Sequence, residues 1–242
     1  MKSEVKNVCA AEEVEFTVPR SRVPFNKPYV TGRELAYVEQ AFANFHLSGN
    51  GMFTEKCQRW LEAATGSPKS FLTHSGTGAL EMSAILADIK DGDEVIMPSF
   101  TFVTTASAFV LRGAVPVFID IRPDTLNIDE KLICRAITKK TKAIVPVHYA
   151  GVSCDMDSIC QIAADHNLIV IEDAAHALKS SYKNLPVGCR GDMAAFSFHE
   201  TKNIIAGEAG ALLINNERLI ERAHIVWEKG TNRREFYMGQ TD

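Results

Sequence analysis

Residues 141–173 read TKAIVPVHYAGVSCDMDSICQIAADHNLIVIED, and this stretch decides the fold class. Its two apolar runs, Lys142–His148 and Leu168–Glu172, have the length and composition of buried strands. Between them, Met156–His166 has the apolar spacing of a helix. A strand, a helix and a second strand in this order predict a right-handed crossover between two parallel strands.

The same alternation continues on both sides of this unit. Further strands are predicted at Ser70–Thr73, Glu94–Pro98, Pro116–Asp120, Met193–Phe198 and Ala211–Asn215, and further helices at Glu34–Phe45, around Cys57–Leu61, and at Ala79–Ile89, Thr104–Arg112, Asp129–Ile137 and Glu217–Glu228. The sequence therefore predicts an α/β fold with a mainly parallel sheet and helices on both faces. Residues 1–22 are expected to form an N-terminal extension, and residues 23–242 one large domain.

The composition is that of an ordinary globular chain. The 242 residues are 46% hydrophobic and 23% charged, with a formal net charge of −4. A negative net charge disfavours a nucleic acid or an anionic membrane as the partner. We find neither an apolar run of membrane-spanning length nor the apolar core of a signal peptide near Met1. The six cysteines form no CxxC pair, so we expect reduced thiols in a cytoplasmic protein.

Open parallel sheets bind ligands beyond the carboxyl ends of their strands, so the segments that follow the strands are the candidates for a site. After the first strand, His74–Ala79 is a small-residue turn that opens a helix and suits a phosphate group. After the second strand, Phe102 can stack on a flat ring. Taken singly, tight packing explains the small residues of the turn about as well as phosphate binding does. A place in the hydrophobic core explains Phe102 better than ring stacking does.

Polar residues follow the later strands. Asp173 ends an apolar strand, where a buried carboxylate needs a cation or several donors, although a role as a helix cap explains it equally well. Glu172 is expected to point to the opposite face. His148 suits either titration near neutral pH or a structural hydrogen bond. Lys202 lies in a small-residue segment just past a strand, an unusual place for a lysine. These signals all fall on one edge of the sheet.

One cofactor explains the combination. Pyridoxal phosphate (PLP) needs a lysine amine for its attachment, a carboxylate at its ring nitrogen, an anion site for its phosphate and an aromatic side chain against its ring. Lys202, Asp173, the Ser75–Ala79 turn with Ser197, and Phe102 supply these groups. To move a proton between carbon atoms, Lys202 needs a lowered pKa, toward about 7–8, which burial favours.

Segments along the chain resemble the DegT/StrS-type sugar-nucleotide aminotransferases, a family of fold-type I PLP enzymes. Ile171–His176 and Ser197–Asn203 look like the two signature segments of that family, and Pro98–Val103 and Pro146–Gly151 are similar to others. The resemblance runs from about Val23 to the last residue. It is therefore far more specific than any single motif.

The resemblance implies a role for each candidate residue. Lys202 would attach the cofactor, and Asp173 would contact the pyridine nitrogen. His176 would lie near the ring hydroxyl, and Phe102 would stack on the ring. The phosphate would be bound by Gly76, Thr77 and Ser197.

The resemblance also implies a reaction and partners. It is strongest toward members that convert dTDP-4-dehydro-6-deoxy-glucose to dTDP-4-amino-4,6-dideoxygalactose, with glutamate as the amino donor, for a bacterial surface polysaccharide such as lipopolysaccharide. It further implies a homodimer with active sites at the subunit boundary, and no metal.

Two features depart from the family pattern. Gly207-Glu208-Ala209-Gly210 has an alanine where the family commonly has a third glycine, and a positive φ at Ala209 would be strained. The sequence also stops at Asp242, so the C-terminal small domain of the family is expected to be missing.

Three other interpretations are each addressed by a specific feature of the sequence. A catalytically impaired remnant that only binds PLP or a nucleotide-sugar, or merely dimerises, is favoured by the early stop. Sugar dehydratases of the same family carry histidine in place of the lysine, and Lys202 disfavours them. A dinucleotide-binding fold needs GxGxxG after the first strand, and Ser75–Gly78 lacks the third glycine.

Overall fold

The computed structural model describes residues 24–240, so the extension expected at residues 1–22 lies outside the described residues. A seven-stranded sheet with the strand order β1-β9-β8-β5-β4-β2-β3 forms its centre. The strands are β1 (Lys69–Thr73), β2 (Glu94–Pro98), β3 (Val115–Ile119), β4 (Thr141–Ile144), β5 (Ile169–Asp173), β8 (Met193–Ser197) and β9 (Gly210–Ile214). A small hairpin of β6 (Ser181–Tyr182) and β7 (Leu185–Pro186) forms a second sheet, which the sequence did not predict.

Six of the seven strands run in one direction. The neighbours from β8 through β5, β4 and β2 to β3 pair in parallel, and β9 pairs antiparallel with both β8 and β1. The mainly parallel sheet predicted from the sequence is therefore confirmed. The antiparallel direction of β9 fits its connection, because residues 198–209 between β8 and β9 contain no helix, whereas a parallel crossover usually contains one.

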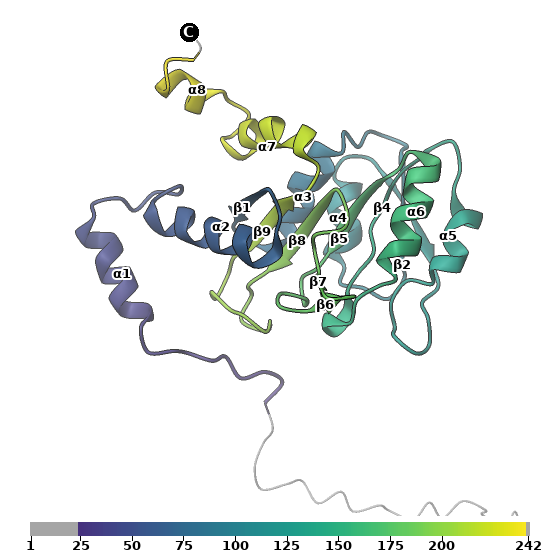
Figure 1. The fold of residues 1–242 in the computed structure, drawn as a ribbon, viewed down its shortest axis with the longest axis horizontal. Helices are drawn as coiled ribbons and strands as arrows, with labels where there is room; N and C mark the ends of the chain where they lie inside the picture. Colours follow the sequence, from purple (N-terminus) through teal and green to yellow (C-terminus); the bar gives the residue numbers. More distant parts are fainter. Residues whose placement is uncertain (1–23, 241–242) are drawn as a thin grey trace, which may run out of the picture.

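Helices cover both faces of the sheet, as predicted (Figure 1). One face carries α3 (Gly76–Leu86), α4 (Thr104–Val110) and α7 (Ile220–Trp227), and the other carries α2 (Met52–Thr65), α5 (Glu130–Ala136) and α6 (Met156–His166). Apart from this body, α1 (Glu34–Ala43) extends to one side, and the short α8 (Arg233–Tyr237) follows α7. No helix within residues 24–240 is both long enough and apolar enough to cross a bilayer.

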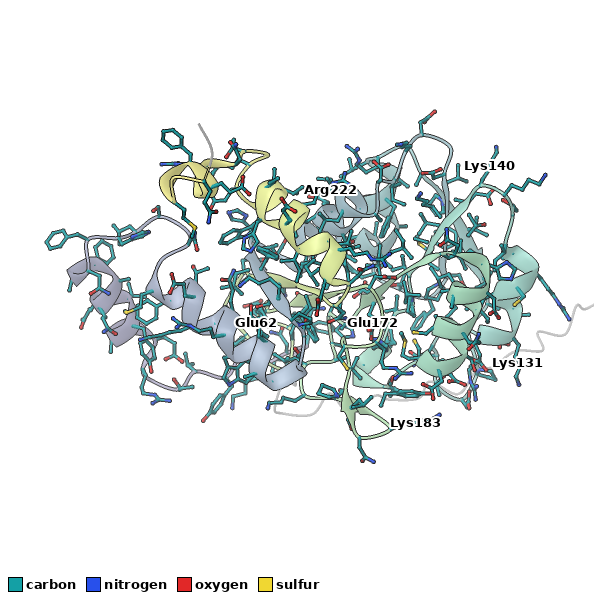
Figure 2. All side chains as sticks on the ribbon, turned by 45° about the horizontal axis from the view of Figure 1, so that its top comes forward. Glu62, Lys131, Lys140, Glu172, Lys183 and Arg222 are labelled. Carbon is teal, nitrogen blue, oxygen red and sulfur yellow. The ribbon has the colours of Figure 1, made fainter. Side chains whose placement is uncertain are left out.

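Charged side chains lie mostly at the periphery. Lys131, Lys140 and Lys183 are exposed at the edges of the view in Figure 2, whereas Glu172 lies in the interior. A carboxylate in that position needs compensating donors, which are described with the site below.

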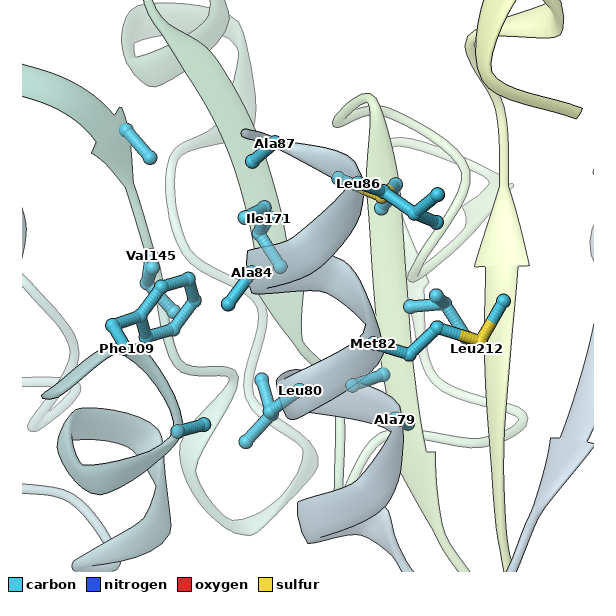
Figure 3. Packing of buried hydrophobic residues seen from close by; sticks show 14 of the residues in the cluster. Ala79, Leu80, Met82, Ala84, Leu86, Ala87, Phe109, Val145, Ile171 and Leu212 are labelled. Carbon is cyan, nitrogen blue, oxygen red and sulfur yellow. The ribbon is translucent and has the colours of Figure 1, made fainter. Parts of the chain in front are cut away.

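The largest core cluster is built around α3 (Figure 3). Met82 of this helix is buried in one cluster with Leu212 of β9, Ile171 of β5 and Phe109 of α4. Alanines at several positions along α3 have no bulk beyond Cβ, so the helix lies close to the strands. The helix is therefore fixed over β9 and β8, with its N-terminus at the carboxyl end of β1.

Two element boundaries differ from the prediction in ways that matter for the site. The helix expected from Ala79 begins at Gly76, so Gly76 and Thr77 belong to its first turn. The strand expected through His148 ends at Ile144. Pro146 has no N–H to donate, and only an isolated bridge between Val147 and Asp173 continues the pairing.

Candidate active site

A cavity of about 740 Å³ opens at the carboxyl ends of β1, β5 and β8. Every site residue singled out in the sequence lines it. These residues are Gly76, Thr77, Phe102, Asp173, His176, Ser197 and Lys202. The structure thus brings together segments that are more than a hundred residues apart in the chain, at the sheet edge where ligands of open α/β folds bind.

Asp173 is buried at the end of β5 and has a hydrogen-bond donor on each carboxylate oxygen. The Thr105 hydroxyl donates to Oδ2 at 2.7 Å, and the Ala175 backbone N–H donates to Oδ1 at 3.2 Å. Thr105 lies in α4 and was not singled out from the sequence. Thr101 lies in the segment just before α4, and its hydroxyl oxygen is 2.7 Å from that of Thr105. No local pattern in the sequence points to this contact.

Lys202 is half-buried in the loop between β8 and β9. Its backbone N–H donates to the His199 carbonyl at 2.9 Å, which closes a turn. Burial lowers the pKa of the Lys202 amine, and the charge of Asp173 raises it in part. The two groups therefore interact across the cavity, and the direction of the shift is the one that a proton-transferring lysine needs.

His176 is oriented by its neighbours. The Ala150 N–H donates to Nδ1 at 3.2 Å, so in the neutral ring Nε2 carries the proton. The Tyr149 ring stands edge-on to the imidazole, with 5.5 Å between ring centroids. Burial and the charge of Lys202 lower the pKa of His176. This side chain is thus a neutral hydrogen-bond donor at neutral pH.

The N-terminus of α3 forms a turn whose free N–H groups suit an anion. Ser75 caps the helix, and its hydroxyl accepts a hydrogen bond from the Gly78 N–H at 3.1 Å. The N–H groups of Gly76 and Thr77 belong to the first turn, where a helix offers them no partner. A Cβ on Gly76 would lie 2.8 Å from Cβ of Ser197, so glycine is needed for the two segments to meet.

The glycine-containing stretch after Lys202 is not strained at its alanine. Ala209 is absent from the residues with positive φ, whereas Gly207 has φ of +81°. Gly210 begins β9, and a Cβ there would lie 2.5 Å from the Gly76 nitrogen and closer still to the Ser75 carbonyl. The tight position is therefore Gly210, and the alanine at 209 does not displace the loop.

His148 has the structural role that the sequence left open. It is buried, the Cys154 N–H donates to its Nδ1 at 3.1 Å, and its Nε2 lies 2.8 Å from Oε2 of Glu172. Because Nδ1 accepts, the proton is on Nε2 and is donated to Glu172. Glu172 also accepts backbone hydrogen bonds from Gly188, Arg190 and Gly191. Both side chains are occupied in holding β5 and the loop after β7.

Comparison with known proteins agrees with this arrangement. The model of the DegT/DnrJ/EryC1/StrS aminotransferase family matches residues 28–241. The chain belongs to this family. Among its relatives, the spore coat polysaccharide biosynthesis protein SpsC of Bacillus subtilis is 39% identical over 204 residues, which is 84% of this chain and 52% of that protein. The GDP-perosamine synthase of Caulobacter vibrioides is 36% identical over 218 residues, 89% of this chain and 59% of the synthase.

Solved structures of this family have the same fold. An aminotransferase from Psychrobacter cryohalolentis superposes with a TM-score of 0.85 at 34% identity, over 90% of this chain and 56% of that one. The PLP form of the sugar aminotransferase Spr1654 from Streptococcus pneumoniae has a TM-score of 0.78 at 32% identity, over 87% and 57% of the two chains. DesI with its TDP-sugar product has a TM-score of 0.79 at 33% identity, over 86% and 52%.

This family member therefore has the fold-type I α/β architecture, and the cofactor of the family is PLP. Spr1654 has been solved in both its PLP and PMP forms. The cavity fits this group, because a buried carboxylate, a half-buried amine with a lowered pKa and the Gly76–Ser197 cradle line the same space. The chain spans about half the length of the relatives it matches.

Proposed function

We propose that the protein is a PLP-dependent aminotransferase that acts on a nucleotide-linked 4-keto-6-deoxy sugar. One observation carries the proposal, namely that Lys202 and Asp173 line the same cavity as the anion-binding turn of α3. An amine, a carboxylate and a phosphate site in one cleft are the groups that PLP chemistry requires of a protein.

The residues divide the work as follows. Lys202 would hold the cofactor through Nζ. Once the amino donor displaces this amine from the cofactor, the free Nζ would take up and return the proton that moves during amino transfer. Asp173 keeps a proton on the ring nitrogen, and His176 donates Nε2–H to the ring oxygen. Phe102 covers the ring, while Gly76, Thr77 and Ser197 bind the phosphate. Bound PLP supplies an electron-withdrawing ring to the carbon that loses the proton.

We assign the substrate as dTDP-4-dehydro-6-deoxy-glucose, aminated at C4 to the galacto product with glutamate as donor. The motif resemblance supports this choice, as does the TDP-sugar product held by DesI. The similarity to SpsC, a spore coat polysaccharide biosynthesis protein, supports a role in surface polysaccharide synthesis. The five described cysteines are free thiols, which fits a protein of the cytoplasm.

The active unit that we assign is a homodimer, with residues 23–242 as the large domain. The side chains of α1 support it, because Leu35, Val38 and Phe42 are 77%, 51% and 61% exposed. Such a row of apolar side chains on one helix is typical of a surface that another chain covers. A sedimentation measurement that finds monomers at micromolar concentration contradicts this part of the proposal.

The test of function uses the 242-residue chain with PLP. We expect a visible absorption band that is lost in Lys202→Ala and is discharged by glutamate, followed by amination of the dTDP-keto-sugar. The GDP-linked sugar is the matched control for the nucleotide. A band that survives Lys202→Ala overturns the assignment of Lys202.

A second candidate function is PLP binding without completed amino transfer, because the chain spans only about half the length of the aminotransferase relatives that it matches. The same experiment separates the two. A band that depends on Lys202 but is not discharged by glutamate supports binding alone, and product formation excludes it.

A further inference from the structure

Two threonine hydroxyls connect Asp173 to the loop that carries Phe102. Oγ1 of Thr105 lies 2.7 Å from Oδ2 of Asp173, and Oγ1 of Thr101 lies 2.7 Å from Oγ1 of Thr105. Thr105 is completely buried, while Thr101 is partly exposed and lines the cavity. The three groups form one continuous chain of hydrogen bonds from the strand to the cavity wall.

The direction of this chain follows from the protons available. An ionised carboxylate only accepts, so the single hydroxyl proton of Thr105 is donated to Asp173. Thr101 must then be the donor to Thr105. Each hydroxyl in such a chain polarises the next, which strengthens the bond to the carboxylate.

The contacts fix the plane of the Asp173 carboxyl group. The terminal torsion of an aspartate is broad and roughly two-fold, so an unsupported carboxylate can rotate. Here Thr105 holds Oδ2 and the Ala175 N–H holds Oδ1. A hydrogen bond to a planar ring nitrogen depends on where the carboxylate oxygens lie, and a fixed plane is therefore an advantage for that contact.

The same threonines hold the position of Phe102. The Thr105 N–H donates to the Phe102 carbonyl at 3.1 Å, and Thr101 precedes Phe102 in the chain. Phe102 itself is 67% exposed, so its position depends on its loop more than on packing around the ring. The hydrogen bond between the Thr101 and Thr105 hydroxyls joins the residues that flank Phe102 in the chain, so it restrains the loop on both sides of Phe102.

We propose that Thr105 is a positioning residue of the cofactor site. Together with Thr101 it sets the plane of the Asp173 carboxylate and the position of Phe102. The contact of Asp173 to the ring nitrogen of the cofactor and the stacking of Phe102 on the same ring are thereby aligned with each other. The inference rests on the proposed function and adds two residues to it. Thr105 does not line the cavity, so it acts through Asp173 and Phe102.

The test compares isosteric and conservative variants in the full chain. Thr105→Val removes the hydroxyl and keeps the shape, Thr105→Ser keeps the hydroxyl, and Thr101→Val breaks only the outer link. Ser107→Ala, a half-buried position in α4 outside the residues that line the cavity, is the control. The readouts are the dissociation constant of PLP and the visible circular dichroism of bound PLP, which reports how rigidly the ring is held.

We expect Thr105→Val to weaken PLP binding about tenfold, the usual effect of losing a hydrogen bond to a charged group, and to reduce the circular dichroism per bound PLP. Thr105→Ser and Ser107→Ala are expected to stay close to the unmodified chain. Thr105→Val with an unchanged dissociation constant and an unchanged spectrum overturns the proposal. So does a Thr105→Ser variant that is as impaired as Thr105→Val.

Two further outcomes are decisive. If Thr105→Val fails to fold, Thr101→Val decides, because it leaves Asp173 its own donor. A reduced circular dichroism of bound PLP in Thr101→Val then supports the positioning role, and an unchanged circular dichroism overturns it. If the unmodified chain shows no PLP band that depends on Lys202, the proposed function fails and the positioning role fails with it. If that band is present and only the threonine variants behave otherwise than expected, the positioning role alone fails.

Discussion

The carboxylates of Glu172 and Asp173, neighbours in the chain, serve opposite faces of β5. Asp173 accepts a hydrogen bond from Thr105 and lines the cavity, whereas Glu172 accepts from His148 and from the backbone of the loop after β7. The alternation of side chains along a strand separates the two groups. One acidic pair thus supplies a carboxylate that faces the cavity and an anchor for the strand that carries it.

Glu172→Gln is expected to destabilise the fold. The glutamine side chain accepts hydrogen bonds through one oxygen only. Its NH₂ group would face N–H donors that the second carboxylate oxygen of Glu172 now accepts from, so those buried hydrogen bonds are lost. We expect the free energy of unfolding at pH 7 to fall by about 3 kcal/mol. Glu55→Gln, which removes only an exposed pair with Arg59 on α2, is the control and should change little. Urea denaturation measures both, and equal stability of the two variants contradicts the anchoring role.

The same residue predicts a pH dependence of stability. Although burial opposes its charge, the hydrogen bonds from His148 and the backbone keep the pKa of Glu172 below its usual value. Its contribution is therefore complete above about pH 4.3, where an unfolded glutamate is ionised, and is lost as the pH falls toward the lower folded pKa. Below pH 5, the free energy of unfolding of Glu172→Gln should therefore fall less with pH than that of the unmodified protein. Denaturation curves at a series of pH values measure this difference. An identical acid profile in both proteins argues against it.

Asp173→Asn should lower the pKa of Lys202 further. Burial already lowers that pKa, and the negative charge of Asp173 opposes the shift. Without this charge, the ammonium form loses its stabilisation. In protein without PLP, the pH midpoint for labelling of the Lys202 amine should lie below that of an ordinary lysine, at about 10.4, and lower again in the variant. Asp165→Asn, at an exposed position of α6, is the control. An upward shift in Asp173→Asn rules out the interaction.

Gly210→Ala should disrupt the cofactor site, and Ala209→Gly should not. A Cβ at position 210 meets the Ser75–Gly76 backbone, so β9 and the start of α3 must separate. We expect a loss of about 3 kcal/mol in unfolding free energy and weak PLP binding. Ala209→Gly should cost about 1 kcal/mol or less. Denaturation and PLP titration of both variants provide the measurement, and a normal Gly210→Ala protein would falsify the close approach.

His176→Gln should retain most PLP affinity, whereas His176→Phe should not. Glutamine can accept from the Ala150 N–H and still donate toward the cavity, but phenylalanine can do neither. We expect the dissociation constant of PLP to rise about fivefold to tenfold in His176→Phe. Fluorescence titration at pH 7 compares the two. Equal affinities would remove His176 from the site.

Much of the site could be predicted because its residues follow strands whose local patterns are clear. Apolar runs such as Leu168–Glu172 identify strands without tertiary information, and parallel strands bring their carboxyl ends to one edge. Asp173, Lys202 and the turn before Ala79 could be grouped on that basis. Thr105 could not be assigned a role, since its partner lies 68 residues away and its direction depends on how α4 packs on the sheet.

The amino-acid sequence alone determined the α/β class, the alternation of strands and helices, and which side chains reach the carboxyl edge of the sheet, because these follow from the local spacing of apolar residues. Only the tertiary structure decided the strand order, the reversed direction of β9, the tight position of Gly210 and the partners of Glu172 and Asp173. Those features depend on contacts between segments distant in the chain, and such contacts exist only after the whole sheet has assembled.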